Sequence, residues 1–573
     1  MSYNATGNSA GRRIATLLDE GSFVEIGGAV TARNTDFNLQ EKETPADGVI
    51  TGYGVIDGNL VYVYSQDAAV LNGAIGEMHA KKIAHVYELA VKTGVPVIGL
   101  IDCAGMRLQE STDALAGFGQ IYKMKAKASG IVPQISAVFG NCGGGVAVMT
   151  AMSDFTFMEA QNGKLFVSSP NTLEGNYTDK LDTASADFQK AASNVDVILE
   201  GETEVLNAIR ELVSILPENN NDTAGSDECM DDLNRLVPDF AAEAADAALA
   251  LEDMSDNNFF LELKAGYAKE MVTGFVCFDG MTVGAIANRT AVFDENGKEV
   301  EKFDGRLTTA GCEKAADFVK KCDAFNIPVL TLTNVEGYAT SVEEETTIAT
   351  AAAKLTAAFV EADVPKVNLI VGKAYGSAYI TMNSKHIGAD MVFALPTAQI
   401  GMMDANVAAK IMNADDKDKN VYLEFEGVYQ NAFVYVNNSF AGKCPYGYSN
   451  FYVDITKYLN YNEPNALKVV VKNGVPSGRW YTGGGIYRDV NLMIADRLHL
   501  VPDSVQLAAI EVEDDQAIIR AKSTIAYTGI GIREITLCTE LMDAEGNVVA
   551  FSIGEPVSDD TFVVHIEKAF ADV

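Results

Sequence analysis

The sequence lacks the cysteine spacing of a metal centre or of a disulfide framework. Its eight cysteines are scattered through 573 residues, with no CxxC pair and no histidine at metal-ligand spacing. We therefore expect no metal site and a reducing, cytoplasmic environment. No apolar run is long enough to span a bilayer, and the amino-terminal segment has no signal-peptide pattern.

Positive charge is also scarce. The chain has 43 Lys and Arg against 79 Asp and Glu, which gives a formal net charge of −36. Such a surface repels phosphate backbones, so no nucleic-acid partner is expected. An anionic substrate would need local patches of Lys and Arg. The length and the 48% hydrophobic content predict several globular domains.

Two stretches of the first part follow the same order of predicted elements. The first has strands at 47–67, a helix at 76–94, a strand at 95–105, a helix around Ile121–Ala128 and a strand that ends in glycines. The second repeats this order with strands at 271–289, a helix at 311–326, a strand at 327–337, a helix at 347–365 and a strand that reaches Gly376. Strands separated by helices indicate layered α/β domains, and the repeat indicates two similar ones.

Each stretch ends a strand in small residues directly before a helix, at Gly143-Gly144-Gly145 and at Gly376-Ser377-Ala378. Glycine permits unusual backbone dihedrals and close approach of a ligand. Two backbone N–H groups aimed at one oxygen form an oxyanion hole, in which each donor is worth roughly 3 kcal/mol. Glycine at such a junction can also serve tight packing alone. Neither turn matches the dinucleotide or P-loop pattern.

Several motifs in order carry a resemblance over about Gly11 to Met412. They are TPADGVITGYGVIDGNLVYVYSQD, GAIGEMHAKKI, IDCAGMRLQES, ASGIVPQISAVFGNCGGG, FNIPVLTLTNVEGY and KAYGSAYITM. This segment resembles the carboxyltransferases of biotin-dependent acyl-CoA carboxylases and decarboxylases, such as propionyl-CoA carboxylase β and methylmalonyl-CoA decarboxylase α. The resemblance implies two crotonase-like α/β halves built as ββα superhelices, acyl-CoA as substrate, and biotin on a separate carrier protein. It also implies biotin carboxylase or membrane decarboxylase subunits as partners, and a homo-oligomer.

The resemblance also assigns site residues. The N–H groups of Gly144 and Gly145 would hold the thioester oxygen of the acyl-CoA enolate. The N–H groups of Ser377 and Ala378, after Gly376, would hold the ureido oxygen of biotin. The family needs no side-chain base. The CoA and acyl side would comprise Gly73, Ala74, Gly76, Cys103, Ala104, Gly105, Arg107 and Ile380.

Some positions depart from the family pattern. The chain has Asp102-Cys103-Ala104-Gly105-Met106-Arg107 for DSGGAR, Glu336-Gly337-Tyr338 for PGF, and Gly376-Ser377-Ala378 for GGA. The family also continues past the equivalent of Met412 with helices that close the second half. We therefore expect a truncated second half with weakened dimerisation and activity.

From Val421 the alternation of apolar and polar residues predicts β-strands in VYLEFEG, NAFVYVNN, FYVDITKYL and ALKVVVKN. FEGVYQNAFVYVNN, YGYSNFYVDITKYL and SGRWYTGGGIYRDVNL resemble the sugar-binding jelly-roll of family 2 glycosidases such as β-galactosidase. Leu498–Val573 resembles the immunoglobulin-like domain that follows it. Arg479 and Trp480 are candidates for sugar contact, or they pack against a neighbouring domain. Hydrolysis is not expected, because the catalytic barrel is absent.

The sequence thus predicts four domains, at 1–245, 246–413, 414–497 and 498–573: two crotonase-like halves, an all-β jelly-roll sandwich and an Ig-like β-sandwich. Three functions stay open at this point. The first is carboxyl transfer between biotin and a short-chain acyl-CoA. The second is a carbohydrate-binding fragment without catalysis. The third is a non-natural fusion, joined near Ile411–Asp416, with no single function.

Overall fold

The computed structural model describes residues 7–35, 39–176, 180–223, 229, 231–232, 234–237, 240–294, 296–404, 407–408, 419–461, 463–474, 483–512, 517–529, 535–554, 557–560 and 563–570. The chain divides into two compact units, Met1–Met403 and Asp404–Val573. The division falls ahead of the expected 413/414 boundary. The expected join at 411–416 lies outside the described residues. The expected boundaries at 245/246 and 497/498 stay predictions.

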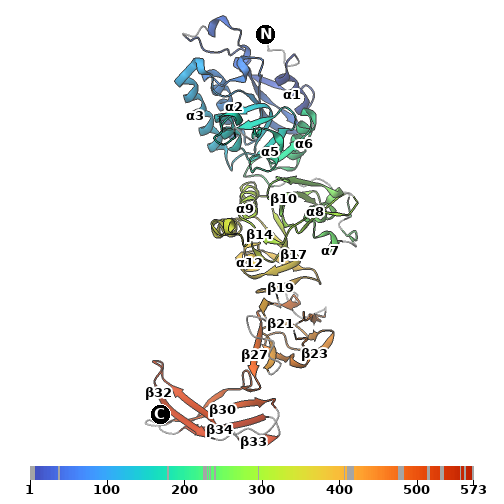
Figure 1. Ribbon diagram of the computed structural model, residues 1–573, viewed down its shortest axis with the longest axis vertical. Helices are drawn as coiled ribbons and strands as arrows, with labels where there is room; N and C mark the ends of the chain where they lie inside the picture. Colours follow the sequence, from blue (N-terminus) through green and yellow to red (C-terminus); the bar gives the residue numbers. More distant parts are fainter. Residues whose placement is uncertain are drawn as a thin grey trace. The chain divides into compact units, whose positions relative to one another are not determined.

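The first half of unit 1 is built on an eight-stranded sheet (Figure 1). An antiparallel hairpin opens it, and parallel strands follow, as expected for strands joined through helices. Residues 97–101 of β4 form an apolar run that is buried almost throughout, which is typical of a parallel strand covered on both faces. The strands are β1 (Val24–Ile26), β2 (Val49–Ile56), β3 (Asn59–Gln66), β4 (Val97–Cys103), β5 (Gln134–Gly143), β6 (Phe155–Glu159), β7 (Lys164–Phe166) and β8 (Val197–Leu199). The helices are α1 (Ser9–Leu17), α2 (Glu77–Thr93), α3 (Ser111–Ala128), α4 (Gly145–Ala151), α5 (Ala186–Lys190) and α6 (Glu202–Ile215).

The second half repeats this plan around a seven-stranded sheet. Its hairpin β10/β11, parallel strands β15 and β17 and short strand β19 correspond in order to β2/β3, β4, β5 and β7. The strands are β9 (Phe260–Leu263), β10 (Met271–Phe278), β11 (Met281–Asn288), β12 (Ala291–Phe293), β13 (Glu299–Lys302), β14 (Arg306–Leu307), β15 (Val329–Val335), β16 (Gly337–Tyr338), β17 (Lys366–Tyr375), β18 (Met391–Ala394) and β19 (Gln399–Gly401). The helices are α7 (Phe240–Glu243), α8 (Ala247–Met254), α9 (Thr309–Ala324), α10 (Val342–Glu345), α11 (Ile348–Glu361) and α12 (Gly376–Thr381).

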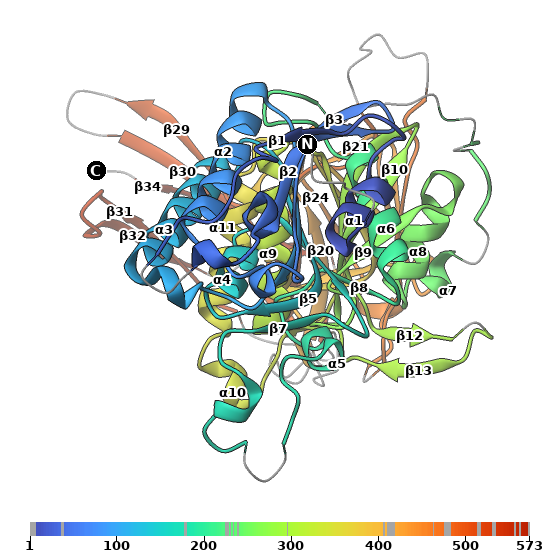
Figure 2. The same ribbon diagram turned by 90° about the horizontal axis from the view of Figure 1, so that it is seen from above.

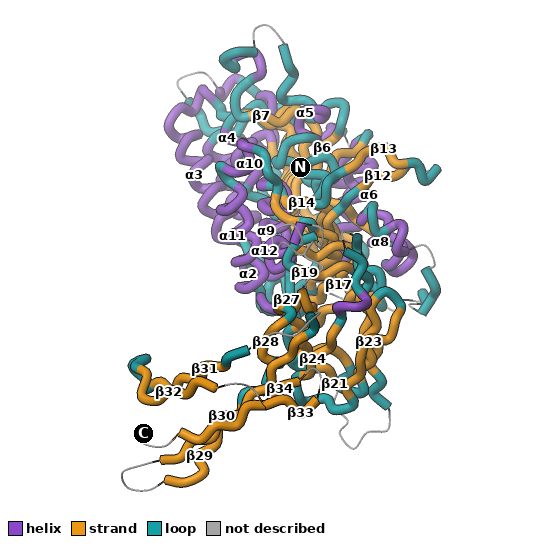
Figure 3. The backbone as a smooth tube through the Cα atoms, turned by 60° about the horizontal axis from the view of Figure 1, so that its bottom comes forward, coloured by secondary structure: helices purple, strands orange, loops and turns teal. Residues whose placement is uncertain are grey.

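The two halves share one hydrophobic core, which makes unit 1 a single body. The Phe155 ring lies 5.9 Å from the Phe275 ring, and Phe275 lies 5.3 Å from Phe318. The ammonium of Lys321 lies 5.6 Å above Phe155. Helices α2, α3, α9 and α11 gather on one side of the strands, and α6 and α8 lie on the other (Figures 2 and 3).

In unit 2 the described strands form several small sheets. Strand β20 (Lys419–Phe425) pairs with β24 (Phe451–Asp454) and β27 (Val490–Asp496), and β22 (Ala432–Val436) pairs with β23 (Ser439–Cys444) and β25 (Leu467–Val471). Leu423 and Phe425 are buried and Glu424 is not, as the alternation predicts. The jelly-roll and immunoglobulin-like topologies that we expected are not shown. The remaining strands are β21 (Val428–Tyr429), β26 (Gly485–Ile486), β28 (Leu498–Leu500), β29 (Gln506–Val512), β30 (Ala517–Tyr527), β31 (Leu537–Met542), β32 (Val548–Gly554), β33 (Val557–Asp560) and β34 (Val563–Phe570).

Candidate functional site

The first glycine turn joins β5 to α4. Gly144 has φ 61° and ψ −125°, a conformation that only glycine adopts readily. Its N–H donates to the carbonyl of Phe166 at 2.9 Å and thereby extends the β5/β7 pairing. The expectation that this N–H faces a ligand is therefore corrected. The N–H groups of Gly145 and Val146, at the start of α4, have no partner one turn earlier.

The second turn lies at the equivalent place and also has a glycine with positive φ. Tyr375 pairs with Gly401 of β19, as Gly143 pairs with Phe166 of β7, and Gly376 then has φ 58°. Ser377 and Ala378 thus correspond to Gly145 and Val146. Helices α4 and α12 have only seven and six residues, so local N–H groups rather than a helix dipole would act on a ligand.

Each turn is contacted by a tyrosine hydroxyl. Tyr122 on α3 donates to the carbonyl oxygen of Gly145 at 2.7 Å. Tyr338 on β16 donates to the carbonyl oxygen of Ser377 at 3.1 Å. Sequence reasoning missed both residues. The only signal was that Tyr338 stands where the resembled family has phenylalanine.

The expected CoA-side residues other than Ile380, which lies on α12, come together in two loops that run side by side. The N–H of Ile75 donates to the carbonyl of Gly105 at 2.9 Å, and the N–H of Ala104 donates to Asn72 at 3.0 Å. A Cβ on Gly73 would lie 2.2 Å from the carbonyl oxygen of Asp102, so only glycine fits there. Gly105 approaches the first glycine turn, since a Cβ on it would lie 3.6 Å from the carbonyl oxygen of Gly143.

Arg107, which we expected on the CoA side, has its side chain buried in a cluster of ion pairs. Its side chain is 1% exposed, and its Nη1 lies 2.6 Å from Asp47 and 2.8 Å from Glu110. Its Nη2 donates to the carbonyl of Ala74 at 2.8 Å. We call Asp47, Arg107 and Glu110 the carboxylate–arginine cluster.

The two carboxylates of this cluster cap helix α2. Glu110 accepts the N–H of Glu77 at 2.6 Å, and Asp47 accepts the N–H of His79 at 2.7 Å. Burial raises the pKa of Asp47, and the charge of Arg107 opposes that shift. The cluster therefore fixes the loop that contains Gly73, Ala74 and Gly76.

The cysteines at the first turn are unsuited to nucleophilic chemistry. Cys103 and Cys142 are fully buried, and burial raises the pKa of each thiol to about 12. Burial also holds the pKa of His79 well below its ordinary value. The His79 Nδ1–H donates to the carbonyl of Asp47 at 2.9 Å, so its Nε2 accepts from Gln66 at 3.1 Å. Among the described residues, no group of three or more His, Cys, Asp or Glu could hold a metal ion.

The second turn has space beside it. Ser377 is exposed, and the side chain of Ile380 is 40% exposed on α12. A mostly apolar hollow of about 430 Å³ adjoins this helix, and its lining includes Tyr338, Ile348, Ala349, Ala352, Thr356 and Thr381. The structure thus leaves Ser377 and Ile380 exposed on α12, whereas Ala378 between them is buried.

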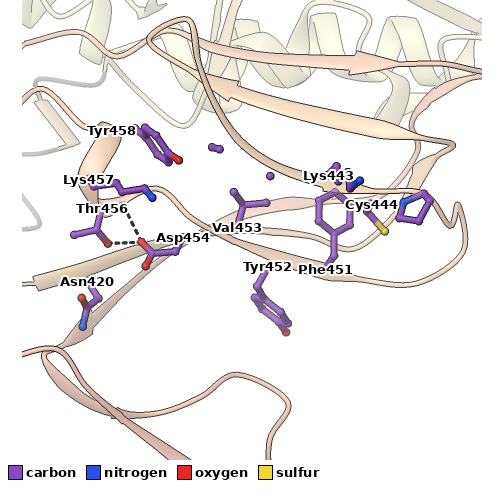
Figure 4. A pocket seen from close by; sticks show the side chains of 13 residues that line it. Asn420, Lys443, Cys444, Phe451, Tyr452, Val453, Asp454, Thr456, Lys457 and Tyr458 are labelled. Atoms are coloured by element: carbon purple, nitrogen blue, oxygen red, sulfur yellow. Dashed lines mark hydrogen bonds between the residues drawn. The ribbon is translucent and has the colours of Figure 1, made fainter. Parts of the chain in front are cut away.

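Unit 2 contains a separate pocket of about 540 Å³ between its small sheets (Figure 4). Asp454 and Thr456 lie together at one part of it, joined by a hydrogen bond of 2.6 Å. Arg479 and Trp480, the expected sugar-contacting residues, lie outside the described residues. The pocket therefore adds no support to sugar binding. No helix in the described part of the chain is long and apolar enough to cross a membrane.

Comparison with known proteins agrees with the arrangement of unit 1. The profile of the family described as carboxyl transferase domain matches residues 3–423. The propionyl-CoA carboxylase beta chain of Roseobacter denitrificans is 39% identical over 444 residues, which cover 74% of this chain and 85% of that one. The methylmalonyl-CoA decarboxylase subunit alpha of Propionigenium modestum is 39% identical over 426 residues, which cover 72% and 80%.

A solved structure agrees as well. Transcarboxylase 12S, whose structure is described as a hexamer with hydrolysed methylmalonyl-coenzyme A bound, aligns with a TM-score of 0.66 and 34% identity over 71% of this chain and 79% of its own.

These matches also correct two expectations. The family match runs on to residue 423, into β20, so a truncation near Met412 is not supported. None of the relatives described here is a glycosidase, and a fused family 2 glycosidase part or a chimera is likewise not supported. Since the match covers most of the chain, the protein belongs to the carboxyl transferase domain family.

Proposed function

We propose that the protein transfers a carboxyl group between biotin, carried on a separate protein, and a short-chain acyl-CoA. The observation that carries this proposal is the repeated turn. Two left-handed glycines, Gly144 and Gly376, each precede two backbone N–H groups at the same place in two similar halves. Carboxyl transfer has two reacting partners, and each develops negative charge on an oxygen.

In the first half, the N–H groups of Gly145 and Val146 would hold the thioester oxygen of the acyl-CoA enolate. Gly105 lies close to this turn, and the carboxylate–arginine cluster holds the neighbouring loop in place. Because these donors are set in place by the fold, they cost no reorganisation when charge develops. The thiols of Cys103 and Cys142 stay protonated and take no part.

In the second half, the N–H groups of Ser377 and Ala378 would hold the ureido oxygen of biotin. Bound biotin would supply the carboxyl group and the base that exchanges a proton with the acyl α-carbon. The residues present fit such a group, because Ser377 is exposed and a mostly apolar hollow of about 430 Å³ adjoins α12 at Thr381. Ile380 would line the acyl pocket, and its apolar side chain suits a short acyl group.

The relatives support the same partners. Their names describe a carboxylase beta chain and a decarboxylase alpha subunit, which are single components of larger enzymes. We propose that this chain likewise acts with a biotin carrier protein and with biotin carboxylase or membrane decarboxylase subunits. We also propose that it forms a homo-oligomer, as transcarboxylase 12S does.

The test is loss of CO2 from malonyl-CoA or methylmalonyl-CoA by the purified full chain, with and without free biotin. The proposal expects CO2 release that requires biotin and saturates with acyl-CoA. Ala378→Pro removes one proposed donor N–H and should abolish the biotin-dependent release of CO2. Absence of biotin-dependent CO2 release with both substrates would overturn the proposal.

A further inference from the structure

Two tyrosine hydroxyls contact the repeated turns at the same chemical group. Tyr122 donates to the carbonyl oxygen of Gly145 at 2.7 Å, and Tyr338 donates to the carbonyl oxygen of Ser377 at 3.1 Å. Gly145 and Ser377, which supply these carbonyls, directly follow the left-handed glycines of the two turns, Gly144 and Gly376. The contact is therefore made at the same point of both turns.

The bonded carbonyls belong to the peptide units that carry the proposed donors. The carbonyl of Gly145 shares its peptide with the N–H of Val146, and the carbonyl of Ser377 shares its peptide with the N–H of Ala378. A peptide unit is planar, so a hydrogen bond that holds the C=O also fixes the direction of the N–H. It also polarises the unit, which strengthens the N–H as a donor.

The surroundings hold each hydroxyl in this role. Tyr122 packs edge-on against Phe118, with ring centroids 6.1 Å apart. A Cβ on Gly145 would lie 3.0 Å from the Tyr122 hydroxyl, so glycine leaves room for the contact. The Tyr338 hydroxyl also lies 2.9 Å from Thr381 Oγ1, which can donate to it while Tyr338 donates to Ser377.

We infer that Tyr122 and Tyr338 are positioning residues for the two oxyanion holes, each aiming and polarising one donor peptide. This inference rests on the proposed function. Neither tyrosine transfers a proton, because each hydroxyl hydrogen is engaged by a backbone carbonyl. Tyr122 would serve the acyl-CoA side, and Tyr338 the biotin side.

The first test is local and does not depend on activity. The full chain is labelled with carbonyl-¹³C serine and ¹⁵N alanine, and the Ser377–Ala378 cross-peak is assigned by its loss in Ser377→Thr. Tyr338→Phe should shift this cross-peak. With ¹³C glycine and ¹⁵N valine, Tyr122→Phe should shift the Gly145–Val146 peak, assigned through Val146→Ile. Cross-peaks that stay in place would overturn the inference.

The second test is kinetic. Each single Tyr→Phe variant should lower kcat for biotin-dependent CO2 release about fivefold to tenfold, the size of one hydrogen bond, while KM for acyl-CoA stays within about twofold. The effects should multiply in the double variant, because the two turns act on different partners.

The matched control is Tyr487→Phe in unit 2. The Tyr487 hydroxyl donates to the carbonyl of Gly447 at 2.7 Å, so this variant loses the same kind of bond within unit 2 and leaves both turns unchanged. It should match the wild type. If the wild-type chain is active and the variants equal it, the inference is overturned. If the wild-type chain is inactive, the proposed function fails, while the cross-peak shifts still decide the hydroxyl contacts.

Discussion

The amide N–H of Gly144 lies 2.9 Å from the carbonyl oxygen of Phe166 and belongs to the sheet. The left-handed glycine thus turns the chain, and the two residues after it begin α4, where their N–H groups have no partner within the helix. Gly376 likewise has a positive φ, 58°, directly before Ser377 and Ala378. The glycine that the sequence marks most clearly therefore has a conformational role, and its neighbours carry the proposed chemistry.

This division predicts different outcomes for two neighbouring alanine substitutions. Gly144→Ala should cost about 1–3 kcal/mol of unfolding free energy through backbone strain alone, since no atom lies within 4 Å of the added Cβ. Gly145→Ala brings its Cβ to 3.0 Å from Phe118 and from the Tyr122 hydroxyl. Gly145→Ala should therefore lower kcat more than Gly144→Ala does, and should lower the free energy of unfolding less. Urea unfolding and CO2 release measured on both variants check this, and the reverse ranking would contradict it.

Removing Arg107 should strongly destabilise the fold, because the carboxylates of Asp47 and Glu110 would then be buried without a cation. Arg107→Met should lower the unfolding free energy by about 3–5 kcal/mol at pH 7. The folded-state pKa of Asp47 is already raised and would rise further, so the deficit should shrink as pH falls and the carboxyl binds a proton. Denaturant unfolding at several pH values measures it.

Arg33→Met is the matched control for Arg107→Met. Arg33 also pairs with two carboxylates, Glu77 and Asp113, but its side chain is 44% exposed. Its loss should cost less than about 1 kcal/mol. Equal losses for Arg33 and Arg107 would show that burial of the cluster is not what makes it important.

Lys125 should impose a pH dependence on stability. It is fully buried between the Tyr87 and Ser153 hydroxyls, each 2.8 Å away, and burial lowers its pKa from 10.5 to about 7 while the charge of Asp154 opposes the shift. Between these values the unfolded chain holds a proton that the folded chain gives up. Stability should therefore rise with pH across this window, by up to about 1.4 kcal/mol per unit.

Lys125→Met lacks this titration. The difference in unfolding free energy between variant and wild type should fall steadily from pH 7 to pH 10, as measured by urea unfolding. Parallel curves for the two proteins would contradict the assignment to Lys125.

Ile380 should influence the length of the acyl group. Its side chain is 40% exposed beside the second turn, and Ile380→Ala removes three carbons from that surface. We expect kcat/KM to shift toward longer acyl-CoA substrates by about tenfold, the value of one to two methylene contacts. Competition between short- and longer-chain substrates measures this ratio, and an unchanged ratio would remove Ile380 from the acyl pocket.

The repeated order of elements and the two glycine turns could be predicted from the sequence, because both depend on local patterns. The role of the Gly144 N–H could not, since its partner lies on β7, over twenty residues further on. The burial of Arg107 could not be predicted either, because charged residues are usually exposed and one of its two carboxylate partners, Asp47, lies sixty residues earlier. In unit 2 alternation predicted strands correctly, but alternation does not specify which strands pair.

The two tyrosines occupy different positions in the two similar halves. The glycine turns lie at equivalent places, as a gene duplication would leave them. Tyr122, however, lies on α3, whose counterpart is α11, whereas Tyr338 lies on β16, directly after β15, whose counterpart is β4. One ancestral tyrosine cannot have supplied both hydroxyls. The same contact to the turn is therefore made from two non-equivalent positions of the repeated plan.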